Sequence, residues 1–286
     1  MKAPVMCTLL TAAVAMSVAL AGVGCGKDSG KQDSAGAKDA AGKTAVGPKW
    51  ANGAYDKDEF ADKTLAILDG STFDAVARDK VGAKLYKYYD SRGKCMDAIL
   101  AGEADGMLVE EPVARKFAAQ HPDSLIVLYP KVDREDYANL FCKKDKGKMR
   151  DEFNAFLKEI TASGIYKEMV QRWVDTPDSP PMPEITLSPT KKKLVFATSD
   201  CDLPFSFKDG SGAIVGFDIE MAMRFAQANG YGIEVKVMAF PDIIPAVSAG
   251  MIDFAANLIA ITEERKGVVD FSEPVYFGGT VMLARK

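Results

Sequence analysis

The chain has 286 residues, of which 48% are hydrophobic and 27% charged, with a formal net charge of −4 at pH 7. This composition is typical of a soluble globular protein long enough for two domains. The weak negative charge, with Lys and Arg scattered along the chain, argues against a nucleic-acid partner. The single histidine, His121, precedes Pro122 in a polar stretch, which favours a solvated loop over a metal ligand or a general base.

Residues 1–25 have the pattern of a signal segment. Lys2 is followed by an uncharged apolar stretch (8–23) that is rather short for a membrane span. The stretch ends at Gly22-Val-Gly-Cys25, which resembles a bacterial lipoprotein signal with Cys25 as the lipidated residue, although Gly22 stands where leucine is usual. We therefore expect a lipid-anchored protein on the periplasmic side of the cell envelope. The alternative is plain secretion with cleavage elsewhere.

The cysteines do not have the spacing of a metal site. Removal of the signal segment and lipidation of Cys25 leave Cys95, Cys142 and Cys201, with no CxxC or CxxxC pair. One disulfide is open in an oxidising envelope, but buried free thiols are the simpler interpretation. No glycine-rich cofactor loop is found either, so we expect no metal and no cofactor.

Residues 26–56 are rich in Gly, Ala, Lys and Asp and lack apolar periodicity, which predicts a flexible tether. Strands and helices then alternate, which predicts a largely parallel sheet. The strands are expected at 64–68, 85–89, 124–129 and 137–142, with a helix beginning at about residue 73 and another ending at residue 120.

Two amphipathic helices follow, at 149–163 and 165–174, and their aromatic stripes predict core packing. Residues 176–190 are proline-rich and predict a linker that continues neither helix. A second run of alternating elements occupies the rest of the chain. We expect strands at 193–198, 234–238 and 279–285, helices at 218–229 and from residue 262, and a turn at 270–274.

One pattern occurs twice. Ala101-Gly-Glu-Ala-Asp105 and Ala249-Gly-Met-Ile-Asp253 each end a short amphipathic helix and open a buried apolar strand. The glycine suits the left-handed conformation that closes a helix. Two copies of one α/β unit predict two similar lobes, and a cleft between lobes is a common place for small molecules to bind.

From Leu194 onward the sequence resembles lobe 1 of the solute-binding proteins of amino-acid ABC importers. Residues 57–142 resemble lobe 2 of that family, and residues 148–175 its C-terminal helices. The motifs in the lobe 1 stretch are Leu194-Val-Phe-Ala-Thr198, Pro204-Phe-Ser-Phe207, Val215-Gly-Phe-Asp-Ile219, Ile243-Ile-Pro-Ala246, Ile261-Thr-Glu-Glu-Arg265 and Asp270-Phe-Ser-Glu-Pro274. Those in the lobe 2 stretch are Leu68-Asp-Gly-Ser-Thr72, Ala101-Gly-Glu-Ala-Asp105 and Glu110-Glu-Pro112.

The resemblance implies an α/β protein with the two-lobe type II periplasmic-binding-protein fold, each lobe a mostly parallel sheet flanked by helices. The order is circularly permuted, because lobe 2 (57–142) precedes lobe 1 (143–286), which begins with the family's C-terminal helices. The linker 176–190 then joins these helices to the family's N-terminal lobe at 191–286. We expect a single crossover between lobes near residues 137–143, with the two chain ends close together at the lobe boundary.

The resemblance also implies a ligand site. Arg265 is expected to hold the carboxylate of an amino acid, and Ser71 and Thr72 to help from a helix N-terminus. Glu110 is expected to accept the ammonium group, and Phe240 to form an aromatic wall. The competing readings are a surface arginine, simple N-capping and a core phenylalanine.

Four positions depart from the family pattern. Ser199 and Asp202 stand where an acidic and an aromatic residue are usual, and Leu258 and Ala260 where a small residue and a hydroxyl are usual. A carboxylate thus remains near the cleft, and Leu258 narrows the cleft. This favours a polar or cationic amino acid that contacts Asp202, or a ligand other than a plain α-amino acid.

We therefore expect a monomeric, non-enzymatic receptor that captures an amino acid and delivers it to an ABC transporter permease. Two alternatives stay open. One is a dehydratase-type enzyme on the same fold, with Asp202 or Glu110 as its acid or base. The other is a sensory or interaction lipoprotein whose pocket has decayed, which Leu258 and Ala260 would permit.

Overall fold

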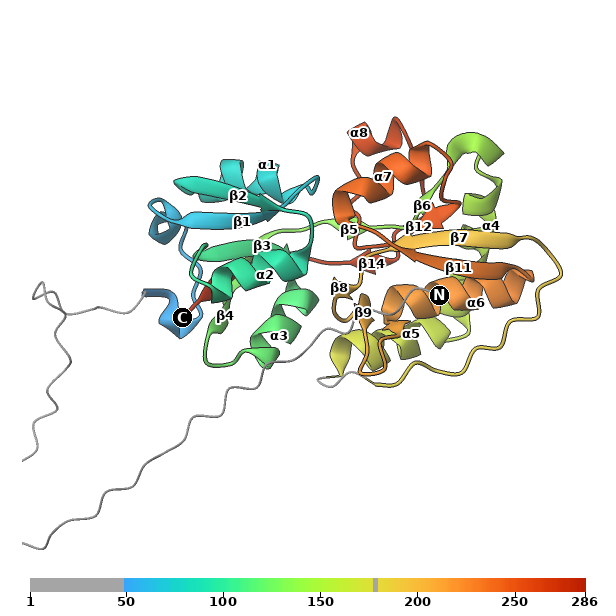
Figure 1. The fold of residues 1–286 in the computed structure, drawn as a ribbon, viewed down its shortest axis with the longest axis horizontal. Helices are drawn as coiled ribbons and strands as arrows, with labels where there is room; N and C mark the ends of the chain where they lie inside the picture. Colours follow the sequence, from blue (N-terminus) through green and yellow to red (C-terminus); the bar gives the residue numbers. More distant parts are fainter. Residues whose placement is uncertain (1–48, 177–179) are drawn as a thin grey trace, which may run out of the picture. The chain divides into compact units, whose positions relative to one another are not determined.

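The structure is a computed structural model that describes residues 49–176 and 180–286. The expected signal segment, its Cys25 and most of the tether lie outside the described residues. Two five-stranded sheets flanked by helices confirm the expected α/β class (Figure 1). Within the described ranges, no helix combines the length and apolarity needed to cross a bilayer.

The first sheet has the strand order β2-β1-β3-β15-β4. β1 pairs in parallel with β2 and β3, whereas β15 runs antiparallel between β3 and β4. We call this sheet and the helices α1, α2 and α3 lobe 2. Its elements are β1 (Thr64–Leu68), α1 (Phe73–Val76), β2 (Leu85–Tyr89), α2 (Arg92–Leu100), β3 (Gly106–Glu110), α3 (Glu111–Gln120), β4 (Leu125–Asp133) and β15 (Thr280–Arg285).

The second sheet has the order β11-β7-β12-β6-β13, with β11, β7 and β12 parallel and β6 antiparallel to both of its neighbours. With a small three-stranded sheet and five helices it forms lobe 1. Its strands are β6 (Leu140–Phe141), β7 (Lys193–Thr198), β8 (Cys201–Asp202), β9 (Ser206–Lys208), β10 (Ile214–Val215), β11 (Gly232–Val237), β12 (Phe254–Ala255) and β13 (Asp270–Phe271). Its helices are α4 (Lys148–Ala162), α5 (Ile165–Val170), α6 (Phe217–Asn229), α7 (Phe240–Ser248) and α8 (Glu263–Lys266).

The chain crosses between the lobes twice, so the expected single crossover is wrong. β5 (Asp136–Tyr137) leads from β4 to β6, and β14 (Tyr276–Phe277) leads from β13 back to β15. The two crossing strands pair with each other in antiparallel fashion (Figure 1). The last strand, expected in lobe 1, therefore lies inside the lobe 2 sheet. Its interior residues are fully buried, and a fully apolar strand carries no alternation that shows which sheet it joins.

The repeated motif has the same structural role in both lobes. Gly102 and Gly250 take the left-handed conformation, with φ of 76° and 70°. The carboxylate of Asp105 accepts a hydrogen bond from the Thr64 backbone N–H (2.9 Å), at the start of β1. Asp253 accepts one from the Val195 N–H (2.8 Å), in β7. Each aspartate thus ties the end of its helix to a strand of its own sheet, β1 for Asp105 and β7 for Asp253, which explains the shared spacing.

The two ends of the described chain lie side by side on lobe 2. The indole N–H of Trp50 donates to the backbone oxygen of Arg285 (3.0 Å), and the indole stacks on Phe60 with ring centroids 4.8 Å apart. The expected closeness of the ends is therefore observed, although within lobe 2 and not at the lobe boundary. Residues 50–56 also pack on this lobe, so the tether ends earlier than expected, because one buried tryptophan does not change the average composition of that stretch.

Candidate functional site

Glu110 lies at the carboxyl end of β3, where parallel strands commonly present ligand-binding groups. Its side chain is fully buried and forms a two-pronged ion pair with Arg92, the first residue of α2. Arg92 Nε donates to one carboxylate oxygen (2.9 Å) and Nη2 to the other (2.5 Å). The expected ammonium acceptor therefore already holds a cation from its own lobe.

Arg92 also contacts lobe 1. Its Nη1 donates to Asn257 Oδ1 (2.9 Å) and lies 3.3 Å from Asp202 Oδ2. The guanidinium carbon lies 5.2 Å from the ring centroid of Phe240, within the range of a cation–π contact. We call Arg92, Glu110, Asp202, Asn257 and Phe240 the Arg92 cluster. Its members come from both lobes and each is at most 4% exposed.

The lobe 1 side of the cluster is a polar network. Ser199 Oγ donates to Asp202 Oδ2, and Asn257 Nδ2 donates to Ser199 Oγ (2.9 Å). Asn257 Nδ2 also lies 3.3 Å from the hydroxyls of Thr198 and Ser206. Asp202 Oδ1 is buried with no hydrogen-bond partner among the described residues. The acid that the sequence placed near the cleft is thus held in position by its neighbours, with one oxygen left free.

Arg265 forms a second link between the lobes. Its guanidinium donates from Nη1 to the backbone oxygen of Ala260 (2.8 Å) and from Nη2 to that of Gly70 in lobe 2 (2.8 Å). The side chain of Thr262 caps α8 by accepting from the Arg265 N–H (3.2 Å), which fixes where the arginine starts. Arg265 is only 9% exposed, so the reading of a surface arginine is wrong.

Ser71 and Thr72 follow Gly70 directly and precede α1. Ser71 Oγ donates to the Leu68 backbone oxygen (2.6 Å) and accepts from the Phe73 N–H (3.2 Å). The Thr72 side chain makes no capping hydrogen bond. Both residues are half-buried beside the residue that Arg265 contacts. The capping interpretation therefore fits Ser71 and not Thr72.

Leu258 and Ala260 occupy the positions where the family pattern is broken. Leu258 is buried, has a φ of 49° and lines a void of about 10 Å³ shared with Tyr137 and Asp218. Ala260 contributes through its backbone, because its oxygen accepts from Arg265. Leu258 thus fills space beside Tyr137 of the crossing strand β5.

The charges of the two arginines respond differently to burial. Burial disfavours the Arg92 cation, but Glu110 and Asp202 outweigh this and hold the pKa of Arg92 above its ordinary value. Burial lowers the pKa of Arg265, which has no carboxylate in hydrogen-bond contact among the described residues. Arg265 is therefore a buried cation whose hydrogen bonds go to neutral carbonyl oxygens, which leaves it able to take an anion.

Comparison with known proteins finds a family model that matches the last third of the chain. Residues 194–286 match the family described as bacterial extracellular solute-binding proteins, family 3. The match includes Asp202, Phe240, Asn257 and Arg265, so the lobe 1 part of the site lies inside the family region.

Individual curated proteins match over a similar length of the chain. The arginine-binding extracellular protein ArtP of Bacillus subtilis is 40% identical over 96 residues, which cover 34% of this chain and 37% of that protein. The L-cystine-binding protein TcyJ of Escherichia coli K12 is 31% identical over 83 residues, covering 29% of this chain and 31% of that protein. The chain thus spans about a third of the length of the curated relatives it matches.

Solved structures show similarity over the same length. An ancestral arginine-binding protein bound to arginine is 45% identical, with a TM-score of 0.29, and covers 29% of this chain and 37% of that one. The arginine-bound form of domain 1 from TmArgBP is 34% identical, with a TM-score of 0.29, and covers 33% of this chain and 80% of that one. The similarity therefore lies in the sequence.

Two members of the Arg92 cluster were not predicted from sequence. Asn257 follows the second copy of the repeated motif by a few residues, at the end of the strand that the motif opens. Arg92 follows Ser91, whose side chain caps α2 by accepting from the Lys94 N–H (3.3 Å). A cation in the first turn of a helix is unfavourable for the helix dipole, and this misfit is the one sequence signal that Arg92 has another partner.

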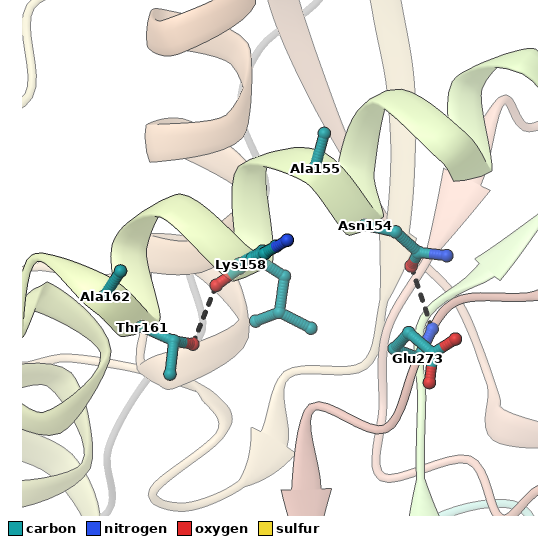
Figure 2. Close-up of a pocket in the computed structure, with 7 residues that line it drawn as sticks. Asn154, Ala155, Lys158, Thr161, Ala162 and Glu273 are labelled. Carbon is teal, nitrogen blue, oxygen red and sulfur yellow. Dashed lines mark hydrogen bonds between the residues drawn. The ribbon is translucent and has the colours of Figure 1, made fainter.

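A groove lies away from this junction. A depression of about 670 Å³ runs along α4 and reaches Glu273, whose N–H donates to Asn154 Oδ1 (2.8 Å) (Figure 2). Its lining includes none of the residues expected to bind ligand. Among the described residues no group of His, Cys, Asp or Glu is placed to hold a metal ion. The lining residues are Asn154, Ala155, Leu157, Lys158, Thr161, Ala162 and Glu273.

Asp218, in the first turn of α6, is expected to make stability depend on pH. Burial and the nearby Asp202 raise the pKa of Asp218 from 3.8 to about 7. The folded chain therefore keeps this proton over a range in which the unfolded chain has lost it. The stabilisation is fully present below about pH 4 and is lost as the pH rises toward 7.

We expect Asp218→Asn to remove this loss, because asparagine does not ionise. Between pH 4 and pH 8 the unsubstituted chain should lose at most about 4 kcal/mol of unfolding free energy that Asp218→Asn keeps. This figure corresponds to the rise of about three units in the pKa of Asp218. Denaturant unfolding of both proteins from pH 4 to 8 measures it, with the exposed Asp123→Asn as the control. Equal slopes for Asp218→Asn and the unsubstituted chain would contradict the prediction.

Proposed function

We propose that the chain is an extracytoplasmic receptor that binds an amino acid between its two lobes and delivers it to an ABC importer. The observation that carries the proposal is the meeting of both lobes on buried charged side chains. Arg265 of lobe 1 reaches Gly70 of lobe 2, and Arg92 of lobe 2 reaches Asp202 and Asn257 of lobe 1. The family of residues 194–286 and the arginine- and cystine-binding relatives support the same proposal.

Each side chain has a role in this proposal that its chemistry allows. The Arg265 guanidinium offers a planar fork for the ligand carboxylate, assisted by Ser71 and Thr72. Glu110 accepts the ligand ammonium, and Phe240 provides an apolar wall. Further contacts come from Ser199, Asp202, Leu258 and Ala260.

The setting of the receptor is part of the proposal. Cys25 carries the lipid, residues 1–25 are the signal segment, and the folded part acts as a monomer on the periplasmic side of the membrane. The lobe order is permuted relative to the family, and no turnover of the ligand takes place. Delivery requires the lobes to open and close around the crossing strands β5 and β14, as in other hinge-type receptors.

The direct test is calorimetric titration of the full chain with each common amino acid, after unfolding and refolding to remove ligand carried through purification. Saturable binding of one class at micromolar concentration or below is the expected result. Recovery of unchanged amino acid after the titration checks that nothing has been turned over. Silence across the whole panel would contradict the proposal.

We expect Arg265→Ala to weaken amino-acid binding by about 100-fold, because two charge-assisted hydrogen bonds to the carboxylate are lost. Arg150→Ala is the matched control, since Arg150 is partly exposed and pairs with Asp151 (2.7 Å) on the surface of α4. Circular dichroism of both variants reports whether the fold is kept. A folded Arg265→Ala protein with unchanged affinity would show that the carboxylate binds elsewhere.

A further inference from the structure

Arg92 makes the contacts that a bound cation would make. Three of the residues expected to surround the ligand touch its guanidinium: Glu110, Asp202 and Phe240. Glu110, expected to take the ligand's ammonium, is paired on both oxygens. The acceptor is therefore not available to a second cation while Arg92 is in place.

Arg92 also joins the two lobes as a ligand does in a hinge receptor. Its side chain starts from α2 in lobe 2, and its Nη1 ends between Asn257 and Asp202 in lobe 1. Closure around a ligand is stabilised by groups that contact both lobes at once. The guanidinium itself provides such contacts.

Local structure does not explain why an arginine stands at this position. It is the first residue of a helix, where the dipole disfavours a cation, and Gly93 follows it. It is 1% exposed, although the neighbouring Lys94 of the same turn extends to solvent and pairs with Asp90 (2.7 Å). The partners that hold Arg92 are thus the buried carboxylates and not its own helix.

We propose that Arg92 is an internal competitor for the cationic end of the ligand: it occupies the Glu110–Asp202 position and must leave before an amino-acid cation enters. The identity of the ligand in this inference rests on the proposed function. The occupancy of the Glu110–Asp202 position by Arg92 does not. It makes Arg92 a specificity-determining residue, because a ligand binds only if its own contacts are more favourable than the contacts that Arg92 loses on leaving. Cationic groups that merely match its guanidinium gain nothing over it.

The test replaces the tethered guanidinium by a free one. Methylguanidinium and L-arginine are titrated into the full chain carrying Arg92→Ala or Arg92→Gln, with binding followed by calorimetry and by thermal unfolding. Arg92→Gln retains hydrogen-bond donors and so protects the experiment if the alanine variant folds poorly. Lys94→Ala controls for loss of a cation from the same helix, and sodium chloride at equal ionic strength controls for screening.

The expected result is that methylguanidinium and L-arginine bind either Arg92 variant at least tenfold more tightly than they bind the unsubstituted chain and the Lys94→Ala protein. Methylguanidinium should also raise the unfolding temperature of the Arg92 variants only. If it stabilises neither variant, or binds the unsubstituted chain equally well, the inference is overturned and Arg92 is a purely structural ion pair.

The two proposals fail in different ways. Methylguanidinium binding by the Arg92 variants, with no amino acid bound by any form of the chain, would keep the competitor and remove the receptor function. Amino-acid binding by the unsubstituted chain that Arg92→Gln leaves unchanged would keep the receptor function and remove the competitor.

Discussion

Arg92→Ala is expected to lower the free energy of unfolding by about 3–5 kcal/mol near neutral pH, the range for breaking one partner of a buried ion pair. The substitution leaves Glu110 and Asp202 buried without their cation, and the cost of those unpaired carboxylates exceeds the loss of the contact itself. Denaturant unfolding measures the change. Lys94→Ala, which removes an exposed pair on the same helix, should cost less than about 1 kcal/mol.

A double-mutant cycle locates the effect. If the cost arises from the Glu110 charge, Arg92→Ala combined with Glu110→Gln should lose less than the sum of the two single variants, with a coupling of about 1–3 kcal/mol. Additive losses would show that Arg92 stabilises through its contacts with lobe 1 instead. A change below about 1 kcal/mol for Arg92→Ala alone would mean that water reaches the carboxylates and that the ion pair is not buried in solution.

The positions that pattern predicts well are those with a local cause. The repeated helix-Gly-x-x-Asp unit lets Asp105 and Asp253 accept a hydrogen bond from β1 and β7, because glycine, a left-handed turn and a carboxylate act within a few residues. Glu110 ends the strand that the first such unit opens, and its side chain is buried.

The positions that pattern misses are those with a distant cause. Arg92 stands between Ser91 and Gly93 in a polar segment, and nothing within ten residues shows that Glu110 and Asp202 neutralise it. The same holds for the last strand, whose buried residues fit either sheet, so that only pairing with β3 and β4 decides its place. Long-range pairing of charges and strands is set by the whole fold.

The second crossover between the lobes restricts how the two lobes can open. Two strands, β5 and β14, connect the lobes and pair with each other. The lobes therefore cannot separate at Tyr137 and Tyr276, which lie opposite each other in register. The ring centroids of these tyrosines are 6.4 Å apart. Opening therefore has to occur as a bend around this pair, which moves apart the edges of the lobes at which α2 and β8 meet.

Gly93→Cys is expected to lock that edge. A Cβ atom at Gly93 would lie 3.3 Å from Cβ of Cys201 and 3.6 Å from its sulfur, close to the separation that a disulfide needs. Gly93 belongs to α2 in lobe 2 and Cys201 to β8 in lobe 1. Cys95, two residues along, is a poor competitor because burial raises the pKa of its thiol to about 12.

Oxidation of the Gly93→Cys protein should remove two alkylatable thiols and raise the free energy of unfolding by about 2–4 kcal/mol relative to its reduced form. Gly93→Ser and a reduced sample are the controls. If the ligand enters between the lobes, the oxidised protein should neither take up nor release an amino acid, and reduction should restore exchange. Exchange that continues at the same rate in the oxidised protein would place the ligand outside the junction of α2 and β8. It would also contradict the ligand-binding role proposed for Glu110 and Arg265.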